Sequence, residues 1–161
     1  MSRAWYGSVQ NRLEENRQFC DEIKVGTGMT EYSWSDRDAY EVIEVKSQKN
    51  VIVRKYDHRH VGDGQMDNSW ELISNPDNPT YELTKRGKYW YYTNTWTAEE
   101  VESTIAHYKE KDPINGEAEV LLHLALGGFD VDRIRTKGKQ TKYRRANVSF
   151  GVANYYYDYS F

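Results

Sequence analysis

The segment that decides the fold reads AYEVIEV at residues 39–45, KSQK at 46–49 and NVIVRKY at 50–56. The two outer runs are rich in Val, Ile and Tyr and interleave apolar with polar residues, which is typical of β-strands with one buried face. The polar residues between them are typical of a turn. The sequence therefore predicts a β-hairpin over residues 39–56, and the other elements are interpreted around it.

Short strand-like runs recur on both sides of this hairpin. Further strands are expected at 69–74, 80–84, 88–93 and 147–153, separated by turns that contain Gly, Pro or Asn. Short strands joined by close turns indicate a small antiparallel sheet or an SH3-like partial barrel. We therefore expect a β core formed by residues 25–96 and 147–161.

Two stretches carry helical signals instead. Residues 2–22 place several apolar side chains near one helical face, which predicts an N-terminal helix. Residues 97–128 open with Thr97-Ala98-Glu99-Glu100, in which a Thr hydroxyl and a Glu carboxylate can satisfy the exposed N–H groups of a first helical turn. Residues 97–128 are therefore expected to form an inserted helical pair.

The second helix of this pair is expected at 116–126, with a stop at Gly127-Gly128. Its apolar stripe consists of Ala118, Leu121, Leu122, Ala125 and Leu126. Taken together, these patterns predict an α+β fold in a single domain spanning residues 1–161. The β core would be interrupted by the helical insertion at 97–128 and by a basic loop at 129–146.

Composition narrows the class of protein. The chain has 161 residues, the size of one domain, and its low apolar fraction of 38% is offset by five Trp and fourteen Tyr that can build a core. A single cysteine, Cys20, excludes an intramolecular disulfide and a metal cluster built on thiolates. No apolar run approaches the roughly 18 residues of a membrane span, and the N-terminus lacks the apolar region of a signal peptide. We expect a cytoplasmic protein that does not associate with membranes.

Positive charge is concentrated between residues 133 and 145, which contain seven Lys or Arg and no acid, although the chain has a net charge of −3. Arg and Lys bind phosphate groups, Arg with bidentate geometry, and a Tyr ring can stack on a base. We therefore predict a nucleic-acid or anion-binding surface formed by Arg133, Arg135, Lys137, Lys139, Lys142, Tyr143, Arg144 and Arg145. The alternative is a solvated loop whose cations pair with the acidic helical segment 97–119.

Two blocks of sequence carry a resemblance. The first contains GTGMT at 26–30 and WSDRDAYEVIEV at 34–45, and the second is NYYYDYSF at 154–161. Together they resemble a family of small uncharacterised proteins from bacteriophages and gut bacteria, with a YSDRxAYTV-like segment early and YYDYSF at the C-terminus. The resemblance covers about residues 25–93 and 147–161. It implies a phage or mobile-element origin, and hence a protein that disarms a system of the host cell.

The basic segment and this resemblance together suggest a non-enzymatic inhibitor of a bacterial defence system, similar to an anti-CRISPR protein. Its partner would be a host defence protein or ribonucleoprotein complex, with nucleic acid or a nucleotide as a further candidate. No catalytic residue, metal or cofactor is predicted. The Gly-rich segments at 26–28 and 62–64 do not open helices with the spacing of a nucleotide-binding fingerprint, so both are interpreted as turns.

Two alternatives from other classes stay open. One is a sponge that sequesters an anionic nucleotide immune signal between a few Arg and aromatic residues. The other is a metal-dependent enzyme that uses His58 and His60, which point to the same face if they lie on a strand. Asp57, Asp63 or Asp67 would then supply a third ligand.

The aromatic tail at 155–161 allows two interpretations as well. Its alternating pattern predicts docking as the final strand of the sheet, because so much free apolar surface would favour aggregation. An exposed tail would instead be an aromatic anchor for a protein partner.

Overall fold

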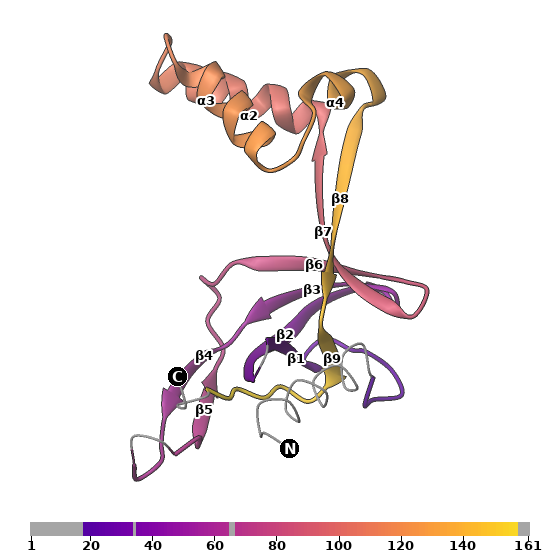
Figure 1. Ribbon diagram of the computed structural model, residues 1–161, viewed down its shortest axis with the longest axis vertical. Coiled ribbons are helices and arrows are strands. Elements are labelled where there is room, and N and C mark those ends of the chain that lie inside the picture. Colours follow the sequence, from indigo (N-terminus) through magenta and orange to yellow (C-terminus); the bar gives the residue numbers. More distant parts are fainter. Residues whose placement is uncertain (1–17, 34, 65–66, 158–161) are drawn as a thin grey trace. The chain divides into compact units, whose positions relative to one another are not determined.

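The computed structural model describes residues 18–33, 35–64 and 67–157, and Figure 1 shows the elements that they form. The chain divides into two compact units. The first, called the β unit below, comprises residues 1–92 and 144–161, and the second, called the helical unit, comprises residues 93–143. Each unit has its own hydrophobic core, whereas the sequence predicts one domain with an insertion.

The strands form a seven-stranded and a two-stranded sheet within the described residues. The larger sheet contains β1 (Gly28–Ser33), β2 (Asp36–Ser47), β3 (Asn50–Lys55), β6 (Thr80–Arg86), β7 (Tyr89–Thr97), β8 (Lys139–Ala146) and β9 (Val148–Gly151). Their order is β8-β7-β6-β3-β2-β1-β9. The smaller sheet pairs β4 (Asp57–His60) with β5 (Trp70–Ile73). The α+β class and the mostly antiparallel sheet are thus confirmed, and the SH3-like barrel stays a prediction.

The hairpin predicted over residues 39–56 is formed by β2 and β3. The two strands pair antiparallel with Val42 opposite Val53 and Val45 opposite Val51, and two residues separate them. Val42, Val51 and Val53 are fully buried, because the alternating pattern directs them to the same side of the sheet. A register shift after Val42 lets β2 bend within this pairing.

The core of the β unit is built around two aromatic rings. Trp90 on β7 and Phe150 on β9 are both 0% exposed, and their ring centroids lie 4.6 Å apart. Only Asn147 separates β8 from β9, although these strands lie at opposite edges of the sheet. One continuous segment therefore supplies both edges, and it contributes Ala146 and Val148 to the same core as Phe150.

The helical unit contains α2 (Ala98–Lys111), α3 (Gly116–Leu126) and α4 (Val131–Lys137). The N-terminal signal of α2 is confirmed, because Thr97 Oγ1 accepts a hydrogen bond from the Glu100 backbone N–H at 3.1 Å. The core of the helical unit is formed by Val101, Ile105, Val120, Leu124, Phe129 and Ile134. Among the described residues, no helix is both long and apolar enough to cross a membrane.

Most of the apolar stripe assigned to α3 from the sequence lies outside the core of the helical unit. The face that packs into the unit carries Gly116, Val120 and Leu124, whereas Leu122 and Leu126 are 60% and 79% exposed. The reason is a close crossing of α2 and α3. A Cβ on Gly116 would lie 2.3 Å from the Tyr108 carbonyl oxygen, so only this glycine-bearing face can meet α2.

The expected basic loop at 129–146 is also corrected. Its residues form α4 and β8, joined at Gly138. The helix begins after Asp130 and ends at Gly138, whose φ of 91° lies in the left-handed region that glycine adopts without strain. The strand follows because β8 finds a partner in β7, a contact that local sequence does not reveal.

The N-terminal helix predicted at 2–22 falls largely outside the described residues. In the C-terminal tail, Tyr156 and Arg37 exchange backbone hydrogen bonds of 2.9 Å in both directions. Tyr157 exchanges hydrogen bonds of 3.0 and 3.1 Å with the Asn68 side chain. The described part of the tail is therefore docked, through an isolated bridge instead of a regular strand.

Candidate anion-binding surface

The first part of the predicted site lies on α4, which is fixed by both of its ends. Asp130 Oδ1 accepts a hydrogen bond from the Arg133 backbone N–H at 3.2 Å, and the Gly138 N–H donates to the Ile134 carbonyl at 2.8 Å. Ile134 is 0% exposed and anchors the helix to the core of the helical unit. The charged side chains of α4 are left on its outer surface.

The three cations of α4 do not share one environment. Arg133 and Lys137 are one helical turn apart and therefore lie on the same face, and both are exposed. Arg135 Nε instead donates to Glu102 Oε1 on α2 at 2.7 Å, which raises the pKa of Arg135. An exposed ion pair of this kind contributes little to stability. The ion pair nevertheless holds the Arg135 side chain against α2. Arg135 is therefore a predicted site residue that pairs with the acidic segment 97–119.

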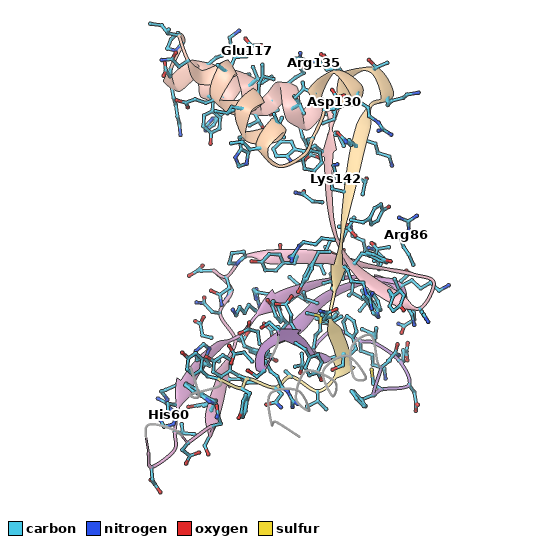
Figure 2. All side chains as sticks on the ribbon, in the orientation of Figure 1. His60, Arg86, Glu117, Asp130, Arg135 and Lys142 are labelled. Atoms are coloured by element: carbon cyan, nitrogen blue, oxygen red, sulfur yellow. The ribbon has the colours of Figure 1, made fainter. Side chains whose placement is uncertain are left out.

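The second part of the site lies at the start of β8, opposite the end of β7. The hydroxyls of Thr95 and Thr141 lie 2.9 Å apart, and the Ala98 backbone N–H donates to the Gly138 carbonyl at 2.8 Å. Lys139 and Lys142 are exposed on this segment, and Tyr143 is 45% exposed. Figure 2 labels Lys142 on β8 and Arg135 on α4.

Four cations of the helical unit thus stay exposed with no ion pair inside the described part of the chain. We call them the basic surface: Arg133, Lys137, Lys139 and Lys142. Lys139 and Lys142 point to opposite faces of β8, because their positions differ by an odd number. Since β8 ends the strand order of its sheet, an extended polyanion can contact both lysines along that edge.

Lysines on an edge strand have a second role in many proteins. Charged side chains on such an edge prevent it from pairing with the edge of another molecule. Lys139 and Lys142 fit that role too, whereas Arg133 and Lys137 lie on a helix, where no edge needs protection. The α4 pair is therefore the part of the basic surface that edge protection does not explain.

Arg144 and Arg145 belong to the β unit, and both are stacked on tyrosines of their own chain. The guanidinium carbon of Arg144 lies 4.8 Å from the ring centroid of Tyr92, and that of Arg145 lies 3.6 Å from the ring centroid of Tyr89. Cation–π contacts of this kind hold the guanidinium over the ring. The sequence predicts that these arginines combine with Tyr143 around a ligand, and in the structure their guanidinium groups lie over tyrosine rings of β7.

The β unit also contains a polar cluster that the sequence did not predict. The hydroxyl of Tyr40 donates to Glu31 Oε1 at 3.3 Å, and the hydroxyl of Tyr92 donates to Glu31 Oε2. Burial raises the pKa of both phenols, and the Glu31 carboxylate raises each further. The signal available in the sequence was faint: Glu31 is two residues from Met29 and so shares the buried side of its strand.

This cluster predicts how stability changes in alkaline solution. The unfolded chain loses tyrosine protons near pH 10, whereas the raised pKa values of Tyr40 and Tyr92 keep these phenols protonated in the folded protein. Their stabilising effect is therefore fully present below about pH 10 and is lost as pH rises above it. We expect urea midpoints to fall as the pH rises through about 10. The fall should be shallower in a Tyr40→Phe, Tyr92→Phe double variant.

The matched control for this titration is Tyr108→Phe, which removes a hydroxyl from a ring that is 42% exposed. It should retain the pH dependence of the unsubstituted protein. An unchanged slope in the double variant would contradict the assignment to the Glu31 cluster.

His58 and His60 lie in an aromatic cluster. Their rings contact Trp70 with centroid distances of 5.2 and 5.0 Å, and His58 also stacks on Tyr155 at 3.7 Å. His60 Nε2 lies 2.5 Å from the Asp67 carbonyl oxygen. Figure 2 labels His60, which is the last residue of β4. No group of three or more His, Cys, Asp or Glu in the described part of the chain is placed to hold a metal ion. The visible role of His58 is to hold the C-terminal tail through Tyr155.

Comparison with known proteins found no match: no protein-family model, no curated protein and no solved structure is similar to the chain. The features that bear on function are therefore those of the chain's own residues. The most specific of them is the basic surface of the helical unit.

Proposed function

We propose that the protein is a non-enzymatic binding protein that contacts phosphate groups of nucleic acid through the basic surface. The observation that carries this proposal is that Arg133, Lys137, Lys139 and Lys142 are exposed and make no ion pair within the described residues. Unpaired surface cations are hydrated and can exchange solvent and counterions for phosphate, which supplies most of the affinity of sequence-independent binding. Tyr143 stands next to Lys142 and offers an exposed ring for base stacking.

The biological setting that we propose is inhibition of a bacterial defence system, as anti-CRISPR proteins do. The basic surface would dock on a host protein or ribonucleoprotein at the place where that protein holds its nucleic acid. This part of the proposal rests on the motifs at residues 26–45 and 154–161, which resemble segments of phage proteins. It requires no catalytic residue, because occupying such a surface is sufficient for inhibition.

The test is a salt titration of binding to labelled duplex DNA, double-stranded RNA and single-stranded DNA. Each phosphate contact contributes about 0.9 to the slope of log K against log salt for duplex DNA. A variant with Arg133, Lys137, Lys139 and Lys142 all replaced by Ala should therefore lose affinity, and its slope should be reduced by about 3 to 4. Replacing only the α4 pair, Arg133 and Lys137, should give about half of that reduction.

The matched control replaces two other exposed lysines, Lys49 and Lys111, by Ala. The Kd of this control should lie within about twofold of that of the unsubstituted protein, because these residues lie outside the basic surface. A twofold change in Kd corresponds to ~0.4 kcal/mol of binding free energy. If this control loses as much affinity as the variant of the α4 pair, only net charge matters and the proposed site is overturned. Release of an intact small nucleotide on heating, with no binding to polymers, would identify the sponge instead.

A further inference from the structure

Helix α3 is apolar on two opposite faces. One face carries Val120 and Leu124 and is buried in the core of the helical unit. The other face carries Leu122 at 60% and Leu126 at 79% exposure, and the alanines at 118 and 125 are exposed beside them. Ile114, two residues before the helix, extends this surface at 89% exposure. We call this outer surface the α3 stripe: Ile114, Ala118, Leu122, Ala125 and Leu126.

Such a helix is unusual on the surface of a protein. A helix that packs on one side only carries charged or polar residues on its other side, and apolar residues all round indicate a helix that is covered on both sides. Single exposed apolar residues need no explanation, but a contiguous stripe of them marks an interaction site. Helix α2 shows the usual pattern, since its outer surface carries Glu99, Glu102, Lys109 and Glu110.

We propose that the α3 stripe is covered by the α3 stripe of a second copy of this chain, with the two helices antiparallel about a twofold axis at Leu122. This arrangement places Leu122 against its own copy and Ala118 against Leu126 of the second copy, at both ends of the contact. A small residue then lies opposite a large one, which lets two helices pack closely. The stripe is thus complementary to itself, as a twofold interface requires.

Charge supports the same arrangement. Glu119 and His123 are exposed on one flank of the stripe, one helical turn apart. Antiparallel pairing about Leu122 places Glu119 of each copy level with residue 125 of the other, two residues along the helix from His123, so the two side chains can form a carboxylate–imidazole contact at each end of the flank. A parallel pair would instead place like residues side by side. The antiparallel pair also aligns the two helix dipoles favourably.

The size of the contact predicts its strength. Two helices of 11 residues each form an interface smaller than the roughly 1,200 Å² below which complexes are weak or transient. The dimer should therefore form and dissociate reversibly with concentration in the micromolar range. This inference does not rest on nucleic-acid binding, since all five stripe residues lie on or just before α3 and none belongs to the basic surface.

The first test is sedimentation velocity of the full chain over a wide concentration range. We expect a monomer–dimer equilibrium, and we expect Leu122→Glu to shift it to monomer at every concentration, because two carboxylates would meet at the axis. Leu122 is already solvent-exposed, so the variant should keep the circular dichroism spectrum of the unsubstituted protein. Ala106→Glu is the matched control, since it adds the same charge at an exposed position of α2.

The second test fixes the register. Leu122→Cys in a Cys20→Ser background should form a disulfide-linked dimer under mild oxidation, because facing residues at the axis lie within reach of a disulfide. Ala106→Cys in the same background should stay monomeric. A protein that is monomeric at all concentrations, or a dimer that Leu122→Glu leaves intact, would overturn the proposal.

Discussion

Replacing Trp90 by alanine is expected to lower the free energy of unfolding of the β unit by about 3–5 kcal/mol. Trp90 is 0% exposed, and its ring packs on Phe150 with centroids 4.6 Å apart. The cost combines the apolar surface returned to water with the cavity that β7 and β9 cannot close. Because the total stability of most domains is only about 5–15 kcal/mol, this single change can leave the unit largely unfolded at physiological temperature.

Urea unfolding followed by far-ultraviolet circular dichroism measures this loss without depending on the tryptophan that is removed. Tyr108→Ala, which truncates a ring that is 42% exposed on α2, is the control and should change stability by less than about 1 kcal/mol. A comparably small change for Trp90→Ala would mean that the Trp90–Phe150 contact is not the centre of the core.

Replacing Gly116 by alanine should destabilise the helical unit by about 1–3 kcal/mol. The added Cβ would lie 2.3 Å from the Tyr108 carbonyl oxygen and 2.6 Å from its carbonyl carbon, and these are backbone atoms that cannot rotate away. Helix α3 must then move off α2, which loosens the packing of Val120 and Leu124. Alanine favours the helical conformation by up to about 1 kcal/mol over glycine, and the steric term outweighs it.

Gly127→Ala is the matched control for this prediction. Its φ is −78°, and a Cβ there would meet its nearest neighbours at 3.5 Å, which is ordinary van der Waals contact. We expect thermal unfolding to show a lower midpoint for Gly116→Ala and an unchanged or slightly higher midpoint for Gly127→Ala. Equal midpoints would contradict the close crossing of α2 and α3.

These two glycines also show where local sequence was informative and where it was not. The hairpin of β2 and β3 and the start of α2 were predicted because their signals lie within a few residues of each other. The orientation of α3 was not, because both of its faces are apolar and the choice depends on the Tyr108 backbone that meets Gly116. The helix α4 was missed although Asp130 and Gly138 mark its ends, because the charged residues between them were interpreted as a loop.

The sequence likewise predicted one property of the candidate site, the exposure of its cations, but did not predict their partners. The exposure of the cations between 133 and 145 followed from their charge and proved correct for all seven. Their partners did not follow, since the ion pair of Arg135 with Glu102 and the stacking of Arg145 on Tyr89 join residues far apart in sequence. The Glu31 cluster has the same origin, because Tyr92 reaches Glu31 only once β7 and β1 belong to one sheet.

The hydrogen bond from Ala98 to Gly138 has a consequence for how the protein folds. It closes the segment between β7 and β8, and a flexible loop over the same residues would cost roughly 3 kcal/mol of chain entropy on closure. Here α2, α3 and α4 form mainly from contacts that are near in sequence, which are made early in folding. Once formed, they hold the ends of β7 and β8 together, so the helical unit does for this strand pair what a two-residue turn does for β2 and β3.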